Sequence, residues 1–393
     1  MDKTIYFDYA ATTPTKKEVV EEMIPYFTQD FGNPSSIYSI ANKNKEAIMK
    51  SRDRVAKAIN ANNNEVYFTG SGTEADNWAI KGIAESYRTK GKHIITSRVE
   101  HHAVLHTCEY LEKNGYEVTY LDVDKYGMIS IDDLRKAIRD DTILITIMYA
   151  NNEIGTIQPI NDIGAIAKEN NIIFHTDAVQ ALGAIDIDVK ASNIDLLSMS
   201  AHKIYGPKGV GALYIRKGVK IKAFIHGGAQ EKRRRAGTEN VPGIVGFAKA
   251  LELIVENREK NNERIIKLRD RLIKEVTETV PHCHLNGHPT KRLPNNVNFS
   301  FSFIEGESLL IMLDMKGICA SSGSACTSGS LDPSHVLMAI GLPHETAHGS
   351  LRITLGEDST EEDIDYLIEV LSPIVKRLRE MSPLYEDFVK NNK

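Results

Sequence analysis

Apolar residues recur along the chain in two alternating patterns, one typical of strands and the other of helices. Between several short apolar runs lie segments with apolar residues three and four positions apart, such as 71–88 and 103–115, which predict helices. Because near-continuous apolar strands alternate with helices, we expect a mostly parallel mixed sheet between helices. The predicted strands lie at 65–70, 93–97, 117–123, 143–150, 171–177, 195–200 and 211–216.

The pattern changes in the last third of the chain. A long charged helix is predicted over 243–280, and a final helix over 360–381. Between them, 295–303 alternates apolar and polar residues, which predicts an antiparallel, half-buried strand. We therefore expect a large α/β domain over 12–257. A smaller α+β domain would comprise 1–11 and 258–393 and would carry a loop at about 320–333.

The segment 13–27 predicts a helix near the N-terminus. Thr15 and Glu18 stand at the spacing of a capping box, in which two side chains bond reciprocally to the first helical turn. The apolar stripe that follows comprises Val19, Val20, Met23, Ile24 and Phe27.

Composition narrows the possible functions and partners. The 393 residues are 41% hydrophobic with a net charge of −5, so no basic excess points to nucleic acid. The longest apolar run, 143–150, is far shorter than the roughly 20 residues that span a bilayer. With four cysteines and no secretory signal pattern at the start, we expect a cytoplasmic location and no disulfide framework. The basic run 232–235 is either a solvated loop or an anion-binding segment.

The lysine at position 203 follows the predicted strand 195–200 and precedes a turn rich in glycine and proline. Ligands of open α/β sheets bind at the carboxyl ends of strands, so Lys203 is a candidate site residue. Ser200 and His202 flank it with hydrogen-bond donors. The plain alternative is a solvated surface lysine.

Asp177 directly follows another predicted strand, with Gln180 three residues on. A buried carboxylate needs a partner, and a protonated pyridine nitrogen would be one. The alternative is that Asp177 caps a helix N-terminus.

The segment 69–77 joins a predicted strand to a predicted helix through Gly70 and Gly72, and Thr73 opens the helix. Free N–H groups and the helix dipole would suit a phosphate there. An ordinary strand–turn–helix junction remains the alternative, because no nucleotide-binding motif is matched.

Histidines cluster after the strand 93–97. His101 can place its ring over a cofactor, whereas His102 and His106 have a helical spacing that could ligate zinc, although no further ligand completes a site and we expect no metal. Asn152 can supply an additional donor. Together, the strand ends offer a lysine, an acid, a phosphate cradle and a stacking ring, which pyridoxal phosphate requires.

The stretch 321–330, SSGSACTSGS, carries Cys326 among small polar residues. It is either a surface loop with an accidental cysteine or a nucleophile on a mobile segment, since glycine and serine favour flexible, solvated backbone.

The motifs of this chain resemble those of cysteine desulfurases, in the nitrogen-fixation and iron–sulfur-cluster-assembly group of the class V, fold-type I pyridoxal phosphate enzymes. The resemblance runs from residue 7 to residue 356. It is carried by FDYAATTP (7–14), FGNPSS (31–36), GSGTEADN (70–77), EHHAV (100–104), ANNEIGT (150–156), HTDAVQ (175–180), SAHKIYGPKG (200–209), GGAQEKRRRAGTEN (227–240), SSGSACTSGS (321–330) and SLRITLG (350–356).

The resemblance implies a role for each candidate residue. Lys203 would bind pyridoxal 5′-phosphate covalently, and Cys326 would receive sulfur and could transiently ligate an iron–sulfur cluster. Thr238 would reach the phosphate of a neighbouring subunit, which implies a homodimer. The other implied roles are Asp177 at the pyridine nitrogen, Gln180 at the ring oxygen, Gly72, Thr73, Ser200 and His202 at the phosphate, His101 stacked on the ring and moving protons, Asn152 beside the ring, and Arg352 on the substrate carboxylate.

The activity implied is removal of sulfur from L-cysteine, giving L-alanine and a persulfide on Cys326. The sulfur would pass to an iron–sulfur scaffold or another acceptor protein, without a nucleic-acid or membrane partner. The alternatives are a selenocysteine lyase, a related class V aminotransferase and a non-catalytic sulfur-relay protein. An aminotransferase would not need Cys326.

Overall fold

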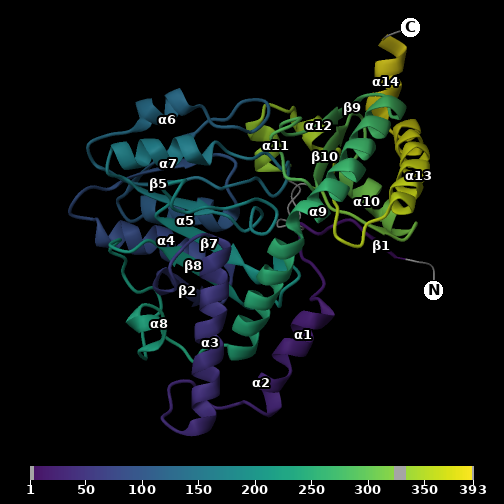
Figure 1. Ribbon diagram of the computed structural model, residues 1–393. Helices are drawn as coiled ribbons and strands as arrows, with labels where there is room; N and C mark the ends of the chain where they lie inside the picture. The colour runs from purple at the N-terminus through teal and green to yellow at the C-terminus, as the bar shows by residue number, and fades with distance from the viewer. Residues whose placement is uncertain (1–3, 323–332, 392–393) are drawn as a thin grey trace.

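A seven-stranded sheet forms the centre of the larger part of the molecule in the computed structural model, which describes residues 4–322 and 333–391 (Figure 1). The strand order is β2-β8-β7-β6-β5-β3-β4. The strands are β2 (Val66–Thr69), β3 (His93–Ser97), β4 (Glu117–Leu121), β5 (Thr142–Thr146), β6 (Ile173–Asp177), β7 (Leu196–Ser200) and β8 (Gly211–Ile215).

The pairing confirms the predicted mostly parallel mixed sheet. Strands β4, β3, β5, β6 and β7 run parallel to one another, whereas β8 is antiparallel to both β7 and β2. Every residue of β3, β5, β7 and β8 is buried. The parallel strands therefore end at one common edge of the sheet, where side chains from distant parts of the sequence meet.

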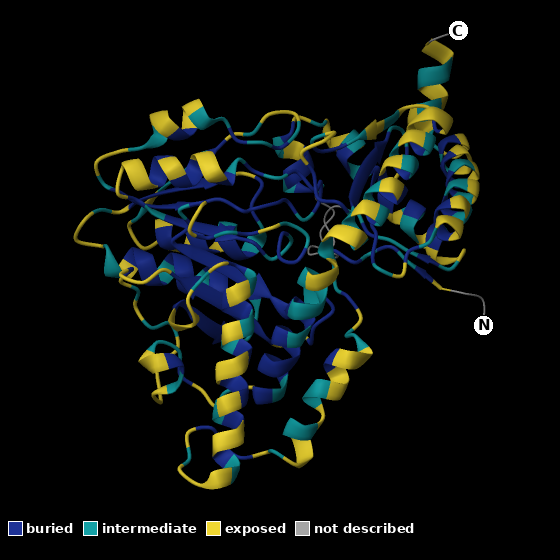
Figure 2. Ribbon diagram, in the orientation of Figure 1, coloured by how far each residue is buried: buried dark blue, intermediate teal, exposed yellow. Residues whose placement is uncertain are grey.

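Helices cover both faces of this sheet, so its strands are buried in the centre of the domain (Figure 2). Helices α4 (Gly72–Ser86) and α5 (His102–Glu112) pack on one face around Trp78 and Val104. The opposite face is covered by α3 (Ser39–Ala58), α7 (Ile160–Glu169) and the first half of α9 (Val241–Thr279). Shorter elements complete this part: α1 (Lys17–Met23), α2 (Pro25–Thr28), η1 (Asn63–Glu65), α6 (Ile131–Ala137), η2 (Ala201–Lys203) and α8 (Gln230–Arg233).

The smaller C-terminal domain has a separate apolar core around the antiparallel sheet β12-β10-β9. The N-terminal strand β1 (Ile5–Tyr6) joins it by pairing with β11 (Ile318–Cys319). Its other elements are β9 (Cys283–Leu285), β10 (Asn296–Phe301), β12 (Ser350–Thr354), α10 (Gly306–Asp314), α11 (His335–Ala339), α12 (His344–His348), α13 (Glu361–Glu380) and α14 (Pro383–Asn391).

Helix α9 belongs to both cores. Leu251, in its first half, packs in the larger core, whereas Leu272 and Val276, in its second half, pack in the smaller one. The predicted boundary at residue 257 therefore lies inside a continuous helix, and the boundary itself stays a prediction.

Two predictions for the segment 13–27 are wrong. Thr15 forms no capping box: α1 begins at Lys17 without a side-chain cap, and the Thr15 hydroxyl donates instead to the carbonyl of Gly206. Of the following apolar stripe only Val19 is buried, whereas Val20, Ile24 and Phe27 are exposed.

The strand β10 is buried on both faces rather than half-buried. The side-chain amides of Asn296 and Asn298 both donate to the carbonyl of Glu153 in the larger domain, and the hydroxyl of Ser300 accepts from Asn286 next to β9. Alternation thus identified the strand, but not what covers its polar face. Among the described residues, no helix is both long and apolar enough to cross a membrane.

Candidate active site

A cavity of about 410 Å³ lies where the parallel strands end, between the larger domain and β12 of the smaller one. Ten of the predicted site residues line it together: Gly72, Thr73, His101, Asn152, Asp177, Gln180, Ser200, His202, Lys203 and Arg352. Thr238 is exposed and is not among the lining residues. Cys326 lies outside the described residues.

The N-terminus of α4 forms one wall of this cavity. Ser71 caps the helix by accepting a hydrogen bond from the Glu74 amide, at 3.1 Å. The N–H groups of Gly72 and Thr73 belong to the first turn, which has no preceding helical carbonyls to bond. A Cβ on Gly72 would lie 2.7 Å from Cγ2 of Val179, so glycine allows the helix end to approach the turn after β6. Such a helix end suits a phosphate group.

Asp177 is the last residue of β6 and is 7% exposed. One of its oxygens accepts a hydrogen bond from the Val179 amide at 2.9 Å, so the carboxyl group caps a turn and also lines the cavity. Burial raises its pKa to about 6, although the positive charge of Lys203 acts in the opposite direction. A buried acid of this kind would hold a cationic nitrogen strongly.

Lys203 lies at the end of η2, three residues beyond β7. Its ammonium group donates to the carbonyls of Ala10 and Ala11 at 2.6 and 2.7 Å. The side-chain amide of Gln180 also donates to Ala10, at 3.0 Å. The N-terminal segment therefore orients both side chains at the wall of the cavity.

His101 is the N-cap of α5. Its Nδ1 accepts a hydrogen bond from the Ala103 amide at 3.1 Å, which places the proton of the neutral ring on Nε2. Burial lowers the pKa of His101 to about 4, so the ring is neutral at physiological pH. A neutral imidazole suits stacking on an aromatic cofactor. His102 and His106, the alternative zinc pair, do not line the cavity.

Arg352 reaches the cavity from β12 and is 3% exposed. Its guanidinium donates to the Asp8 carboxylate at 2.8 Å and to the Asn152 carbonyl at 3.0 Å. Nε of Arg352 is buried and has no hydrogen-bond partner within the described chain. These two contacts fix the guanidinium at the wall of the cavity, where a planar cation suits an anionic ligand.

Sequence reasoning missed two acids of this site. Asp8 holds Arg352, and Asp76 lines the cavity from α4. Both lie within motifs that carry the family resemblance, but neither follows a predicted strand, since the short strand β1 before Asp8 was not predicted. Placing Asp76 requires the helical phase of α4 relative to the sheet, which is set by Trp78 and Ala79 in the core.

The chain is similar over nearly its whole length to proteins of one family. The family model for aminotransferase class-V matches residues 5–367. A protein of Clostridium botulinum described as cysteine desulfurase IscS is 62% identical over 393 residues, covering 100% of this chain and 99% of that protein. One of Methanosarcina thermophila with the same description is 65% identical over 383 residues, covering 98% and 95%.

Solved structures of NifS-like proteins superimpose on nearly the whole chain. A NifS-like protein superimposes with a TM-score of 0.90 at 39% identity, covering 96% of this chain and 100% of that one. A NifS-like protein from Rickettsia africae gives a TM-score of 0.86 at 32% identity, covering 95% and 100%.

Proposed function

The chain belongs to the aminotransferase class-V family, and we propose that it is a pyridoxal-phosphate-dependent cysteine desulfurase. The supporting observation is that one cavity is lined by a lysine, a buried acid, the N-terminus of a helix and an arginine, all from separate elements. Full-length relatives described as cysteine desulfurases give this cavity its most direct interpretation.

The lining residues fit pyridoxal 5′-phosphate part by part. The first turn of α4, with Gly72 and Thr73, holds the phosphate together with Ser200 and His202. Asp177 pairs with the ring nitrogen, Gln180 reaches the ring oxygen and Lys203 is the attachment point. His101 covers the ring, with Asn152 beside it. When bound, the cofactor supplies an electron sink for chemistry at the substrate Cα.

Arg352 binds the carboxylate of L-cysteine. Its planar guanidinium offers two parallel donors, and its contacts to Asp8 and the Asn152 carbonyl fix their direction. The amine of Lys203 then takes and returns protons at the substrate Cα, since a neutral amine within reach of that carbon is a competent general base.

Cys326 receives the sulfur. Its thiolate attacks the substrate sulfur, a sulfur–sulfur bond forms, and the carbon–sulfur bond breaks with its electron pair on carbon. That carbon takes a proton and the substrate leaves as L-alanine, so sulfur is oxidised to a persulfide and carbon is reduced. A free thiol has a pKa of about 8.5, so the thiolate requires local activation. The persulfide sulfur then passes to an acceptor protein for iron–sulfur cluster assembly.

The active unit is a homodimer in which Thr238 completes the phosphate site of the partner subunit. Two features support this: Thr238 is exposed, and it does not line the cavity of its own chain. Exposed apolar residues such as Ile37, which is 95% exposed, supply surface that a second copy would cover.

The test is sulfide and alanine release from L-cysteine by the cofactor-loaded protein in the presence of a reductant. Wild type should release both in equal amounts. Lys203→Ala should lose turnover, and Cys326→Ala should bind the cofactor normally but release no sulfide. Normal sulfide release by Cys326→Ala would contradict the role of that thiol. Alanine release from selenocysteine, measured in parallel, ranks the two substrates.

A further inference from the structure

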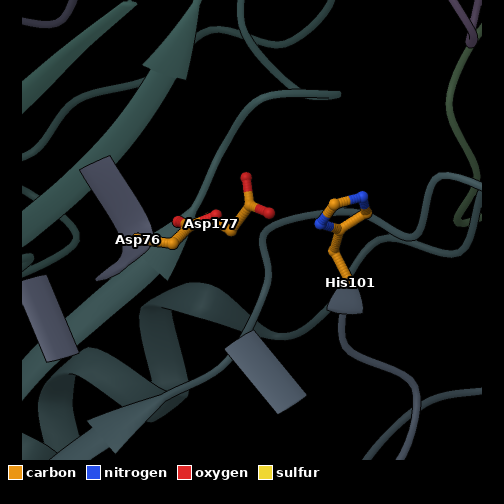
Figure 3. A group of neighbouring side chains, drawn as sticks. All are labelled: Asp76, His101 and Asp177. Carbon is orange, nitrogen blue, oxygen red and sulfur yellow. The ribbon is translucent and has the colours of Figure 1, made fainter. Parts of the chain in front are cut away.

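The carboxyl group of Asp76 has no part in the proposed function, although it lines the same cavity. Asp76 projects from α4 and is 1% exposed. One oxygen of Asp76, one oxygen of Asp177 and one ring nitrogen of His101 lie within 4.8 Å of one another. Figure 3 shows the two carboxyl groups next to each other, with the imidazole facing them. Two carboxylates this close and this buried do not both ionise readily.

The surroundings of Asp76 do not balance a negative charge. Within the described part of the chain, the basic side chain in ion-pair range is His175, whose Nε2 lies 3.6 Å from Oδ1 of Asp76. His175 is fully buried, and burial lowers its pKa to about 3, so its ring is neutral. Its two nitrogens are bonded to the hydroxyls of Thr146 and Ser198, at 2.8 and 3.0 Å.

Asp76 has weaker support for a negative charge than Asp177, since in the described chain only the neutral Ser198 hydroxyl bonds to its carboxyl group. Oδ1 of Asp76 is buried without a hydrogen-bond partner within the described residues. Asp177 instead accepts a bond from the Val179 amide at 2.9 Å, and Lys203 lies close enough to stabilise its charge. A negative charge shared between the two groups is therefore more stable on Asp177.

We propose that Asp76 is held as the neutral carboxylic acid and presents its proton to Asp177, so that the pair carries one negative charge, located on Asp177. This inference rests on the proposed function and deepens it. Asp76 would be a positioning residue, because it acts on the cofactor through Asp177. A carboxylic acid beside a carboxylate is a charge-assisted donor and keeps that carboxylate ionised against a cationic ring nitrogen.

The titratable groups around Asp76 also favour a proton on Asp76 and a negative charge on Asp177. Asp177 and His175 face it from β6, and Glu100 and His101 face it from the segment between β3 and α5. Burial raises the pKa of Asp76 well above its usual range and the negative charges of Asp177 and Glu100 raise it further, against the opposing effect of the Ser198 hydroxyl. The pKa of Asp177 rises only to about 6.

Two substitutions separate a neutral acid from a carboxylate at position 76. Asp76→Asn keeps a neutral donor of the same shape, whereas Asp76→Leu removes the donor. The dissociation constant of pyridoxal 5′-phosphate for the apoenzyme should change less than about threefold in Asp76→Asn. It should rise roughly 10- to 100-fold in Asp76→Leu, the effect of losing one charge-assisted hydrogen bond. If Asp76 were ionised, Asn would remove a charge and weaken binding at least as much as Leu, which would overturn the proposal.

Infrared spectroscopy of the apoenzyme tests the proton directly and does not depend on activity. A neutral carboxylic acid has a C=O stretch distinct from the carboxylate bands and shifted by deuterium. At neutral pH this band should be present in wild type, smaller by one group in Asp76→Asn, and unchanged in the control Glu85→Gln, an exposed position on the same helix. A spectrum that Asp76→Asn leaves unchanged would refute the neutral acid. If the band is present but wild type releases no sulfide, only the proposed function fails.

Discussion

Arg352 is almost completely buried and paired with Asp8, yet it lines the cavity in which the carboxylate of L-cysteine would bind. A lysine at this position would keep the charge but lose the planar fork. We expect Arg352→Lys to raise KM for L-cysteine roughly 10- to 100-fold, as for the loss of a charge-assisted hydrogen bond. Cofactor affinity should stay within about threefold in an absorbance titration. An unchanged KM would show that the carboxylate binds elsewhere.

Glu100 is another buried acid near the site, and it predicts a pH dependence of stability. It is fully buried, accepting from the Ser97 hydroxyl and the Met148 amide, and burial raises its pKa to about 8. Between the unfolded pKa of Glu, about 4.3, and this value, the folded state holds a proton that the unfolded state has lost. Glu100 therefore lowers stability as pH rises through this window, and the full cost is present only above about pH 8.

Between pH 6.5 and 8 other buried acids also titrate, such as Glu153, whose pKa burial raises to about 7, so the contribution of Glu100 is measured as the difference between wild type and Glu100→Gln. In that window the apoprotein should lose about 2 kcal/mol of unfolding free energy through Glu100. Glu100→Gln should remove that part of the slope in urea titrations, whereas Glu85→Gln should not. Parallel pH profiles for wild type and Glu100→Gln would contradict the raised pKa.

Helix α4 shows which features of the site could be predicted from the sequence and which could not. Its start at Gly72 follows from the cap at Ser71, and both the helix and the candidate phosphate cradle were predicted from the sequence. The same prediction could not place Asp76, because burial of a polar residue depends on which side of the helix faces the sheet. The long helices α9 and α13 were also predicted within two residues, because their apolar stripes are long, but the prediction that the latter is the final helix is wrong, since α14 follows it.

A methyl group on Gly72 tests how closely α4 approaches the turn after β6. Gly72→Ala would place Cβ 2.7 Å from Cγ2 of Val179, a contact too short to keep. Such overpacking costs roughly 1–3 kcal/mol, so the apoprotein should unfold at a lower urea concentration and bind cofactor more weakly. The double variant Gly72→Ala/Val179→Ala should recover part of the lost stability. If the double variant is no more stable than Gly72→Ala, the loss of stability does not come from the contact with Val179.

Strand β10 and the N-terminal segment show why long-range packing escaped the sequence analysis. Alternation in β10 predicted one solvent-exposed face, but Asn296 and Asn298 face Glu153 of the other domain. The carbonyls of Ala10 and Ala11 meet Lys203 from nearly two hundred residues away. Local periodicity carries no information about such partners, whereas the motif resemblance pointed to the residues without giving their contacts.

At the scale of the whole molecule, the site lies between two domains that share one helix. Arg352 comes from the smaller domain, Lys203 and Asp177 from the larger one, and α9 packs in both cores. The site is therefore assembled only when the domains are packed together. Thr238 extends this dependence to a second subunit in the proposed dimer.

Subunit exchange tests whether the site is shared. At limiting cofactor, Lys203→Ala and Thr238→Val should each be defective alone. A mixed dimer regains one complete site, because the Thr238→Val chain supplies Lys203 and the other chain supplies Thr238. Mixing the two variants under exchange conditions should therefore restore sulfide release, whereas mixing Lys203→Ala with Lys203→Ala/Thr238→Val should not. Absence of recovery, despite mixed dimers seen by native mass spectrometry, would place each site within one chain.

The most direct measurement of the central claim is mass spectrometry of the cofactor-loaded protein after brief exposure to L-cysteine labelled with heavy sulfur. The peptide that contains Cys326 should gain the mass of one heavy sulfur atom, in step with alanine release. Neither change should occur in Lys203→Ala. A labelled Cys326 peptide in Lys203→Ala, or alanine release by wild type without any labelled peptide, would contradict the proposal that this cavity delivers the sulfur of L-cysteine to Cys326.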